Sequence, residues 1–189
     1  MEGILIAIGM MALFALIGSN RFVLLRKAAD KAFLPFDKLS GEKYRLLQKD
    51  VSASLKTIDK EVEETEEERK LKELESFINK AQNPQLDLNQ KVKAENQVSQ
   101  MLYSLTKEGD KAEGRDTSLF KPSAGYKEIE ENLKVLKKQY NEAVLDYNNA
   151  VFMFPSNVFA LIFRYRPRTT FQFPDETPEQ TKRKFPGRK

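Results

Sequence analysis

The chain contains no cysteine and no histidine among its 189 residues. Without cysteine there is no disulfide, thiolate nucleophile, lipoprotein cysteine or cysteine zinc site. Without histidine the chain lacks the commonest general acid–base group, the serine–histidine–aspartate triad and the commonest transition-metal ligand. Catalysis by carboxylates, or a magnesium site on aspartate and glutamate, is the chemistry that remains. We therefore expect a protein that is not an enzyme and that carries no cofactor or metal.

Net positive charge is also scarce over most of the chain. The net charge is +4, yet residues 1–163 carry 24 lysines and arginines against 25 acidic residues. Residues 164–189 carry eight basic residues against three acidic ones, so the basic character belongs to the C-terminal tail. A uniformly basic nucleic-acid-binding protein distributes its charge differently, which disfavours nucleic acid as a partner.

Residues 3–20 carry no charge at all and are almost purely apolar. With the apolar residues after Arg21 they predict a helix over residues 3–25, long enough to cross roughly 30 Å of hydrocarbon. A cleaved signal peptide would need a basic start and a small-residue cleavage site, and the chain begins instead with Met1-Glu2. A buried soluble helix would need apolar surroundings that the rest of the chain does not offer. We predict a retained transmembrane helix.

The flanking charges predict the orientation of this span. Only Glu2 and the amino terminus precede it, whereas Arg21, Arg26, Lys27 and Lys31 follow it. Basic flanks stay in the cytoplasm. We therefore expect a single-pass protein of the plasma (inner) membrane, with the N-terminus outside and the bulk of the chain cytoplasmic.

Helical periodicity in the rest of the chain predicts an all-α protein. Pro35 is expected to end or kink the first helix near Phe33. Apolar residues recur every three or four positions on both sides of the acidic residues 63–70, which form either an exposed helical turn or the tip of a hairpin. Asn83-Pro84 ends this segment, and a further helix is expected over residues 88–105.

The last helix has the clearest pattern. Apolar and aromatic residues follow alternating steps of three and four from Tyr126 to Phe154, in the order Tyr126, Ile129, Leu133, Leu136, Tyr140, Ala143, Tyr147, Ala150 and Phe154. This heptad seam is typical of coiled coils and bundles.

The patterns together predict an N-terminal transmembrane helix followed by an antiparallel, up-and-down helical bundle. Residues 1–33 would form the transmembrane helix and its extension, residues 36–163 the cytoplasmic bundle, and residues 164–189 a basic tail containing aromatic residues. Four antiparallel segments would return Phe154 to the membrane.

A short signature closes the last predicted helix. Tyr140-Asn141 and Tyr147-Asn148 stand seven residues apart, and Phe154-Pro155-Ser156-Asn157 follows one heptad later. Ala160, Phe163 and the run from Arg166 to Phe171 continue the pattern. This region resembles the C-terminal signature of the LemA family, membrane-anchored helical proteins of bacteria with no settled biochemical activity. The resemblance implies a bacterial membrane protein and supplies no catalytic residue.

Two segments near the amino terminus are also similar to this family. The sequence from Asn20 to Arg26 resembles its Asn-x-Leu-Val-x-Leu-Arg segment, and Ala32-Phe33…Asp37 resembles its Ala-Trp…Asp pattern. The family's Arg-Arg-x-x-Leu-Ile-Pro-Asn-Leu-Val segment has only Leu46-Leu47 and Val51 as counterparts, without the basic pair and the Pro-Asn. The resemblance is close at both ends and loose over residues 40–120.

The tyrosines and asparagines of the signature have a structural and a functional interpretation. As structure, Tyr140, Tyr147 and Phe154 form a core aromatic layer with hydroxyls at the rim. Asn141 and Asn148 then fix the register by hydrogen bonds to a neighbouring helix. As function, the same residues form a polar docking surface for a partner.

The rest of the signature has the same two interpretations. Pro155 would stop the long helix, and Ser156 or Asn157 would cap a short helix over Val158–Phe163. Alternatively these residues belong to the docking surface.

The tail interleaves basic and aromatic residues, and three interpretations are open. It is a solvated tail whose aromatics cover the end of the bundle, a membrane contact, or a nucleic-acid contact. The anchor favours the membrane over nucleic acid, because it tethers the tail near an anionic leaflet. The residues predicted to contact the membrane surface are Arg164, Arg166, Arg168, Lys182, Arg183, Lys184, Arg188 and Lys189.

The function we predict is that of a membrane-bound, non-catalytic scaffold or assembly factor. The alternative is an accessory or sensor subunit of a membrane-associated enzyme or signalling complex. Expected partners are the lipid bilayer, membrane or cytoplasmic proteins that the sequence does not identify, and a second copy of the chain.

Overall fold

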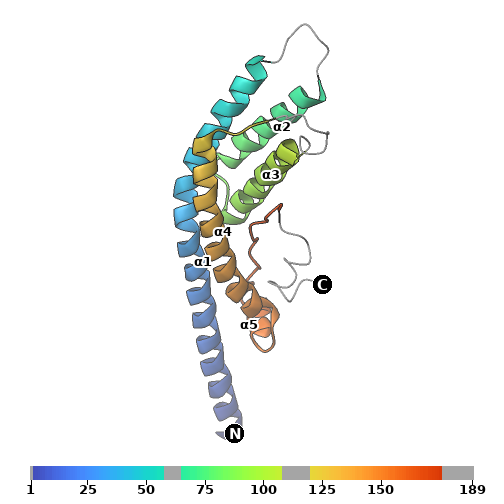
Figure 1. Cartoon of the computed structure of the whole chain (residues 1–189). Coiled ribbons are helices and arrows are strands. Elements are labelled where there is room, and N and C mark those ends of the chain that lie inside the picture. Colours follow the sequence, from blue (N-terminus) through green and yellow to red (C-terminus); the bar gives the residue numbers. More distant parts are fainter. Residues whose placement is uncertain (1, 58–64, 108–119, 176–189) are drawn as a thin grey trace.

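Five helices make up the described part of the chain (Figure 1). The computed structural model describes residues 2–57, 65–107 and 120–175, and for residues 2–19 it describes the backbone alone. The helices are α1 (Glu2–Thr57), α2 (Glu66–Ala81), α3 (Leu88–Lys107), α4 (Ala124–Phe152) and α5 (Ser156–Ile162). No strand occurs within the described ranges. The all-α prediction is confirmed.

Helix α1 runs without a break from Glu2 to Thr57 and contains Pro35. The expectation that Pro35 ends the helix near Phe33 is therefore wrong, and no break separates residues 1–33 from residues 36–163. Pro35 lies on the exposed face of α1, where water can bond the carbonyl that the proline ring leaves without a donor.

The predicted transmembrane span falls mostly on residues 2–19, whose side chains lie outside the described part. Within the part of the chain whose side chains the structure describes, no helix combines the length and the apolar character needed to cross a membrane.

The helices pair in antiparallel fashion. Helix α4 packs along α1, and α2 packs on α3 beside the C-terminal part of α1 (Figure 1). Thr65 starts α2 by accepting a hydrogen bond from the Glu68 amide, and three glutamates in the first turn suit the positive end of the helix. Residues 66–70 of the acidic segment are thus helical, while residues 63 and 64 lie outside the described part.

Three apolar clusters follow one another along the molecule. The first joins α2 and α3 to the C-terminal part of α1 through residues such as Leu47, Leu74 and Val98. The second lies between α1 and α4. The third joins Phe22 of α1 to the end of α4 and to α5. Because α4 returns antiparallel to α1, its end lies beside the part of α1 that leads to the amino terminus (Figure 1).

The turn between α4 and α5 differs from the predicted one. Helix α5 begins at Ser156, its N-cap is Pro155, and no side chain makes a capping hydrogen bond there. The Ser156 hydroxyl instead donates to the Met153 carbonyl at 2.8 Å, so the capping role predicted for Ser156 or Asn157 is wrong. Phe154, predicted for the aromatic core, is 83% exposed.

Candidate functional site

An extended segment, residues 166–172, leaves α5 and runs back along the bundle between α3 and α4 (Figure 1). Helices α3 and α4 do not contact each other through their backbones, so this segment fills the space between them. The tyrosines and asparagines of the signature face it. It will be called the C-terminal strap.

Helix α4 binds the backbone of the strap through both Tyr-Asn pairs. The Asn148 amide accepts from the Arg168 N–H at 2.8 Å and donates to the Arg168 carbonyl at 2.9 Å. One heptad earlier, Asn141 makes the same two bonds with Phe171, at 2.8 and 2.9 Å. The hydroxyls of the two tyrosines donate to strap carbonyls, Tyr147 to Arg166 at 2.9 Å and Tyr140 to Thr169 at 3.0 Å.

The spacing of these contacts has a simple geometric origin. Seven residues of α-helix advance about 10.5 Å, and three residues of extended chain advance about 10 Å. A heptad from Asn141 to Asn148 therefore matches three strap residues, from Phe171 back to Arg168. The tyrosine contacts repeat the same step from Thr169 to Arg166.

Helix α3 binds the opposite edge of the strap with a second heptad pair of asparagines. Asn89 accepts from the Thr169 N–H at 3.0 Å. Asn96 donates to the Thr170 carbonyl at 3.0 Å and accepts from the Gln172 N–H at 2.8 Å. Side-chain amides thus take the place that neighbouring strands would have in a sheet. The sequence analysis missed Asn89 and Asn96, although their spacing of seven residues matches that of Asn141 and Asn148.

Apolar contacts hold the inner face of the strap. Phe171 is 3% exposed and packs against Phe36 and Tyr140, with ring centroids at 4.4 and 5.1 Å. Arg168 pairs with Asp30 at 2.7 Å and lies over the Tyr147 ring. Residues 164–175 of the predicted tail are therefore part of the fold, and Arg168 has a structural partner inside it.

The signature residues fill their predicted structural roles only in part. Tyr140 and Tyr147 are buried with their hydroxyls bonded, in agreement with a core aromatic layer. Asn141 and Asn148 bond to the strap, so the expectation that they bond to a neighbouring helix is wrong. Their amides are occupied by the chain itself. Lys182, Arg183, Lys184, Arg188 and Lys189 lie outside the described residues, so their predicted membrane contact stays a prediction.

We expect Asn141→Ala to lower the free energy of unfolding by about 2–4 kcal/mol, because it leaves a buried N–H and a buried carbonyl of Phe171 unbonded. Denaturant unfolding of the full chain in detergent, followed by circular dichroism, measures the effect. The matched control is Asn149→Ala on the exposed face of the same helix, expected within about 0.5 kcal/mol of the parent. Equal stability of both variants would contradict a structural role for the asparagine.

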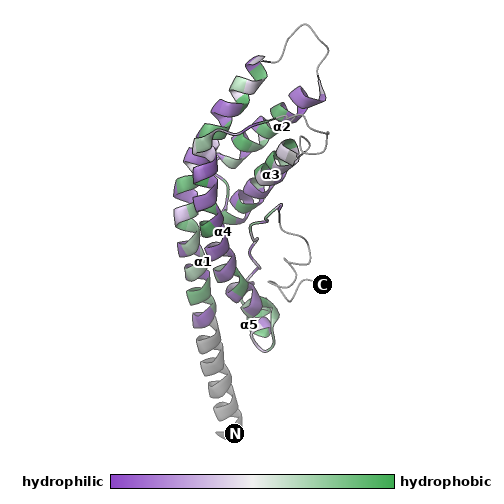
Figure 2. Ribbon diagram, viewed as in Figure 1, coloured by the Kyte–Doolittle hydropathy of each residue, from purple (hydrophilic) through white to green (hydrophobic). Residues whose placement is uncertain are grey.

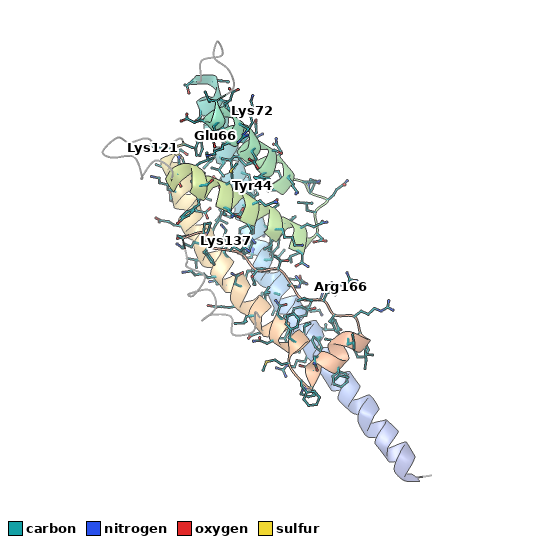
Figure 3. The ribbon with its side chains drawn as sticks, turned by 90° about the vertical axis from the view of Figure 1, so that its right-hand side faces the viewer. Tyr44, Glu66, Lys72, Lys121, Lys137 and Arg166 are labelled. Atoms are coloured by element: carbon teal, nitrogen blue, oxygen red, sulfur yellow. The ribbon has the colours of Figure 1, made fainter. Side chains whose placement is uncertain are left out.

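Two lysines and two glutamates form an ion-pair network inside the bundle, and Figure 3 labels one of them, Lys137. Lys43 of α1 pairs with Glu95 of α3 and, at 2.8 Å, with Glu130 of α4. Lys137 of α4 pairs with the same two carboxylates at 2.7 and 2.8 Å. The Tyr44 hydroxyl donates to Glu95 at 2.6 Å. Lys43 and Glu95 are 0% exposed and Lys137 is 3% exposed, whereas Glu130 is 29% exposed at the edge of the network. The formal charges of the four groups cancel.

The electrostatics of the network keep both glutamates ionised. Burial by itself would raise the pKa of Glu95, but the attraction of Lys137 and Lys43 outweighs it and holds the pKa below its usual range. The same balance lowers the pKa of Glu130. Burial alone would lower the pKa of Lys43, and its two carboxylates raise it instead. Burial and the Glu95 carboxylate raise the pKa of Tyr44, which stays a neutral donor.

The sequence analysis missed this network because it occupies positions of the apolar seams. The buried positions of α4 include Leu133, Lys137 and Tyr140, so Lys137 stands where the predicted seam had Leu136. Glu95 likewise stands three residues from both Val92 and Val98. A charged residue at the three- or four-residue spacing of an apolar stripe was the sequence feature that could have indicated the network.

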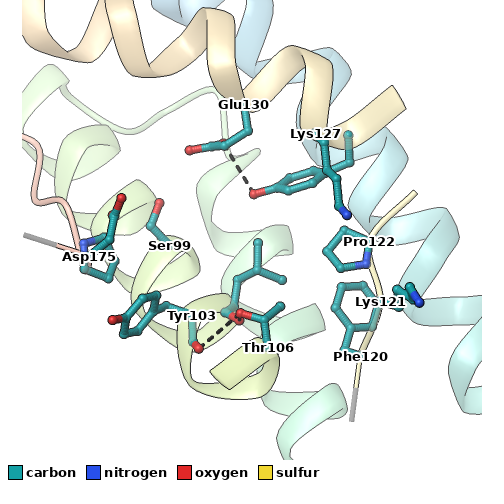
Figure 4. Close-up of a pocket in the computed structure, with 12 residues that line it drawn as sticks. Ser99, Tyr103, Thr106, Phe120, Lys121, Pro122, Lys127, Glu130 and Asp175 are labelled. Atoms are coloured by element: carbon teal, nitrogen blue, oxygen red, sulfur yellow. Dashed lines mark hydrogen bonds between the residues drawn. The ribbon is translucent and has the colours of Figure 1, made fainter. Parts of the chain in front are cut away.

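A pocket of about 530 Å³ opens beside the network (Figure 4). Figure 4 shows Glu130 reaching toward it from α4, where the carboxylate accepts from the Tyr126 hydroxyl at 3.3 Å. Phe120 and Pro122 form one side, and α3 residues such as Tyr103 form another. Over the described ranges no group of three or more acidic residues is placed to hold a metal ion.

The comparisons with known proteins identify the family. The model of the LemA family matches residues 47–185. The match includes the middle of the chain, where the resemblance was loose, and begins after the segments at residues 20–26 and 32–37. Neither the search of curated proteins nor that of solved structures finds a match. Because the matched residues make up most of the sequence, the chain belongs to the LemA family.

Proposed function

We propose that the protein is a non-catalytic scaffold or assembly factor of the bacterial plasma membrane. Residues 3–25 would anchor it as a single-pass protein, with its N-terminus outside and its bundle in the cytoplasm. The observation that carries this proposal is the unbroken course of α1, which connects the uncharged residues 3–20 to the bundle as one helix. A helix without a hinge would hold the bundle at a fixed distance from the bilayer, which suits a protein that positions others.

The buried carboxylates also favour a non-catalytic role. Glu95 and Glu130 converge and have shifted pKa values, which can indicate a catalytic pair, but structural ion pairs shift pKa values as well. Here both pKa values are lowered, and each carboxylate is held by two lysines. A general acid needs a proton near neutral pH, and a general base needs a free lone pair. Neither glutamate offers these, and Glu95 is out of reach of a substrate.

A fluorescent protein fused after Lys189 is expected to fluoresce, and alkaline phosphatase fused there is expected to be inactive. The reason is that the basic residues after the span keep the fused end in the cytoplasm. The measurement is a paired alkaline phosphatase and fluorescent-protein assay in bacterial cells. Phosphatase activity of the fusion would contradict the orientation, and release of the protein by carbonate extraction would contradict the anchor.

Partners are best sought in cells. Crosslinking of the intact membrane, followed by mass spectrometry, should identify membrane or cytoplasmic proteins, or a second copy of this chain, as neighbours of the bundle. A scaffold would give the same neighbours before and after substitutions in the pocket beside Glu130. Loss of every neighbour on such a change would favour a ligand-dependent role instead.

A further inference from the structure

Exposed apolar side chains gather at the end of the bundle where α4 turns into α5. Phe154 and Leu161 are 83% and 81% exposed, and Phe152, Met153 and Ile162 are more than half exposed. In Figure 2 the hydrophobic colour at this end gathers on α5 and the turn before it. Soluble proteins rarely leave so many large apolar side chains together in water. These five residues will be called the apolar end.

The apolar end lies beside the place where the uncharged part of α1 stops. Phe22 is two residues beyond Asn20, the last residue of that run. Its ring stacks on Tyr165 at 4.7 Å and meets Tyr147 edge-on at 6.4 Å. Phe22 also shares a buried cluster with Ala160 of α5. Helix α5 is therefore fixed to α1 at the level where a transmembrane helix would leave the hydrocarbon.

A pocket of about 420 Å³ lies next to the apolar end and is lined by four arginines and two aspartates. Arg168 is paired with Asp30. Across the residues that the structure describes, no carboxylate pairs with Arg26, Arg164 or Arg166. Figure 3 shows Arg166 beside α5, near the point where α1 continues alone. This cationic group suits phosphate groups at the same depth as the apolar residues.

The backbone at Arg164 gives a second reason to assign it a binding role. Arg164 has φ 56°, the left-handed conformation that glycine usually supplies after a helix. The bonds from Arg164 N–H to Leu161 and from Tyr165 N–H to Ala160, at 3.3 and 2.8 Å, complete this helix end. Arginine is disfavoured in this conformation. An arginine at a position whose backbone suits glycine points to a role of its side chain outside the fold.

We infer that the apolar end and the three unpaired arginines form a membrane-inserted surface. Phe154, Leu161 and their neighbours would enter the boundary between headgroups and acyl chains, and Arg26, Arg164 and Arg166 would bind phosphates of anionic phospholipids. The inference rests on the proposed anchor and goes beyond it. The bundle would rest on the bilayer through a second contact, in place of standing on α1 alone.

Because the chain has no tryptophan, a single introduced tryptophan reports its own surroundings. We expect full-length Phe154→Trp protein, reconstituted in vesicles with brominated acyl chains, to emit at shorter wavelength and to be quenched. The control is Val135→Trp, which is exposed on α4 and lies about 25 Å before the end of that helix. Quenching should be about twofold stronger or more at position 154, since interfacial residues sit only about 5–10 Å deep.

A third protein, Phe14→Trp, separates this inference from the anchor. Quenching at position 14 without quenching at position 154 would overturn the membrane-inserted surface and leave the anchor standing. Quenching at neither position would overturn both. The Phe154→Trp emission could instead be blue-shifted without being quenched, and the shift could grow with the amount of protein per vesicle. That result would assign the apolar end to contact with a second copy of the chain and would overturn our inference.

The arginines are tested by adding Arg164→Gly to the Phe154→Trp protein. We expect stronger quenching in vesicles rich in phosphatidylglycerol than in phosphatidylcholine vesicles, and the glycine variant should lose about half of that difference or more. Glycine suits the backbone at this position, so the melting temperature should be unchanged or higher. An undiminished lipid preference would overturn the role of Arg164.

Discussion

Glu95→Leu is expected to lower the free energy of unfolding by about 3–5 kcal/mol. The change leaves Lys43 and Lys137 facing each other in the interior with one shared carboxylate, that of Glu130. An uncompensated buried charge costs more than the ion pair itself contributes, because water no longer solvates it. Denaturant unfolding of the full chain in detergent, followed by circular dichroism, measures the loss.

The double variant Lys43→Met/Glu95→Leu is expected to regain more than half of this loss. It removes one charge of each sign and leaves Lys137 paired with Glu130 at 2.8 Å. Replacing a buried ion pair by apolar residues of similar size is often close to neutral. The surface control is Glu131→Leu on the exposed face of α4, expected within about 0.5 kcal/mol of the parent. A double variant no more stable than Glu95→Leu would contradict the account of buried charge.

The same network predicts the acid sensitivity of the fold. In the folded chain the pKa values of Glu95 and Glu130 lie below the value of about 4.3 that glutamate has in the unfolded chain. The unfolded state therefore binds more protons in acid. The contribution of the network is complete above about pH 5 and is lost as the pH falls. The parent should lose stability more steeply below that pH than the double variant, which lacks one of the two carboxylates.

Phe171→Ala is expected to lower the free energy of unfolding by about 3–5 kcal/mol. The ring fills the space between Phe36 and Tyr140, and its loss leaves a cavity in the second apolar cluster. Phe173 is the matched control, because it lies two residues further along the chain, just beyond the strap, and is only partly buried, with Lys138 over its ring at 5.9 Å.

Phe173→Ala should cost about 1 kcal/mol, the size of an exposed cation–π contact with some lost packing. Thermal or denaturant unfolding of both variants in one detergent provides the comparison. If the two substitutions cost the same, the strap does not close the core, and residues 164–175 would have to be assigned to the outside of the bundle.

Local patterns in the sequence predicted most helices. The heptads of α4, the Asn83-Pro84 break and the stripe of α3 each depend on contacts between neighbouring turns, so periodicity reveals them. A proline inside a helix lowers the stability of the helix by about 3 kcal/mol, so Pro35 predicted a break. Packing along the rest of α1 offsets this loss, and the helix continues. The predicted antiparallel arrangement is confirmed, because α4 returns beside α1.

The strap and the network could not be predicted in the same way. Both depend on residues far apart in the chain, such as Asn148 with Arg168 and Lys43 with Glu95. The signature residues were visible, but the partner of their amides was the chain's own backbone, which has no sequence pattern of its own. Charged residues at seam positions carry no apolar signal, and only the full set of four shows why the burial of their charge is tolerated.

The matched steps of helix and strap affect which changes in sequence this fold can accept. The asparagines bind backbone groups, so side chains at Thr170 or Gln172 can be exchanged with little effect on the fit. An insertion or deletion is different. One residue removed between Asn141 and Asn148 turns one amide by about 100° away from its partner, and one removed between Arg168 and Phe171 shifts the strap by about 3.4 Å. Chain length in these two short intervals should therefore be fixed while composition drifts.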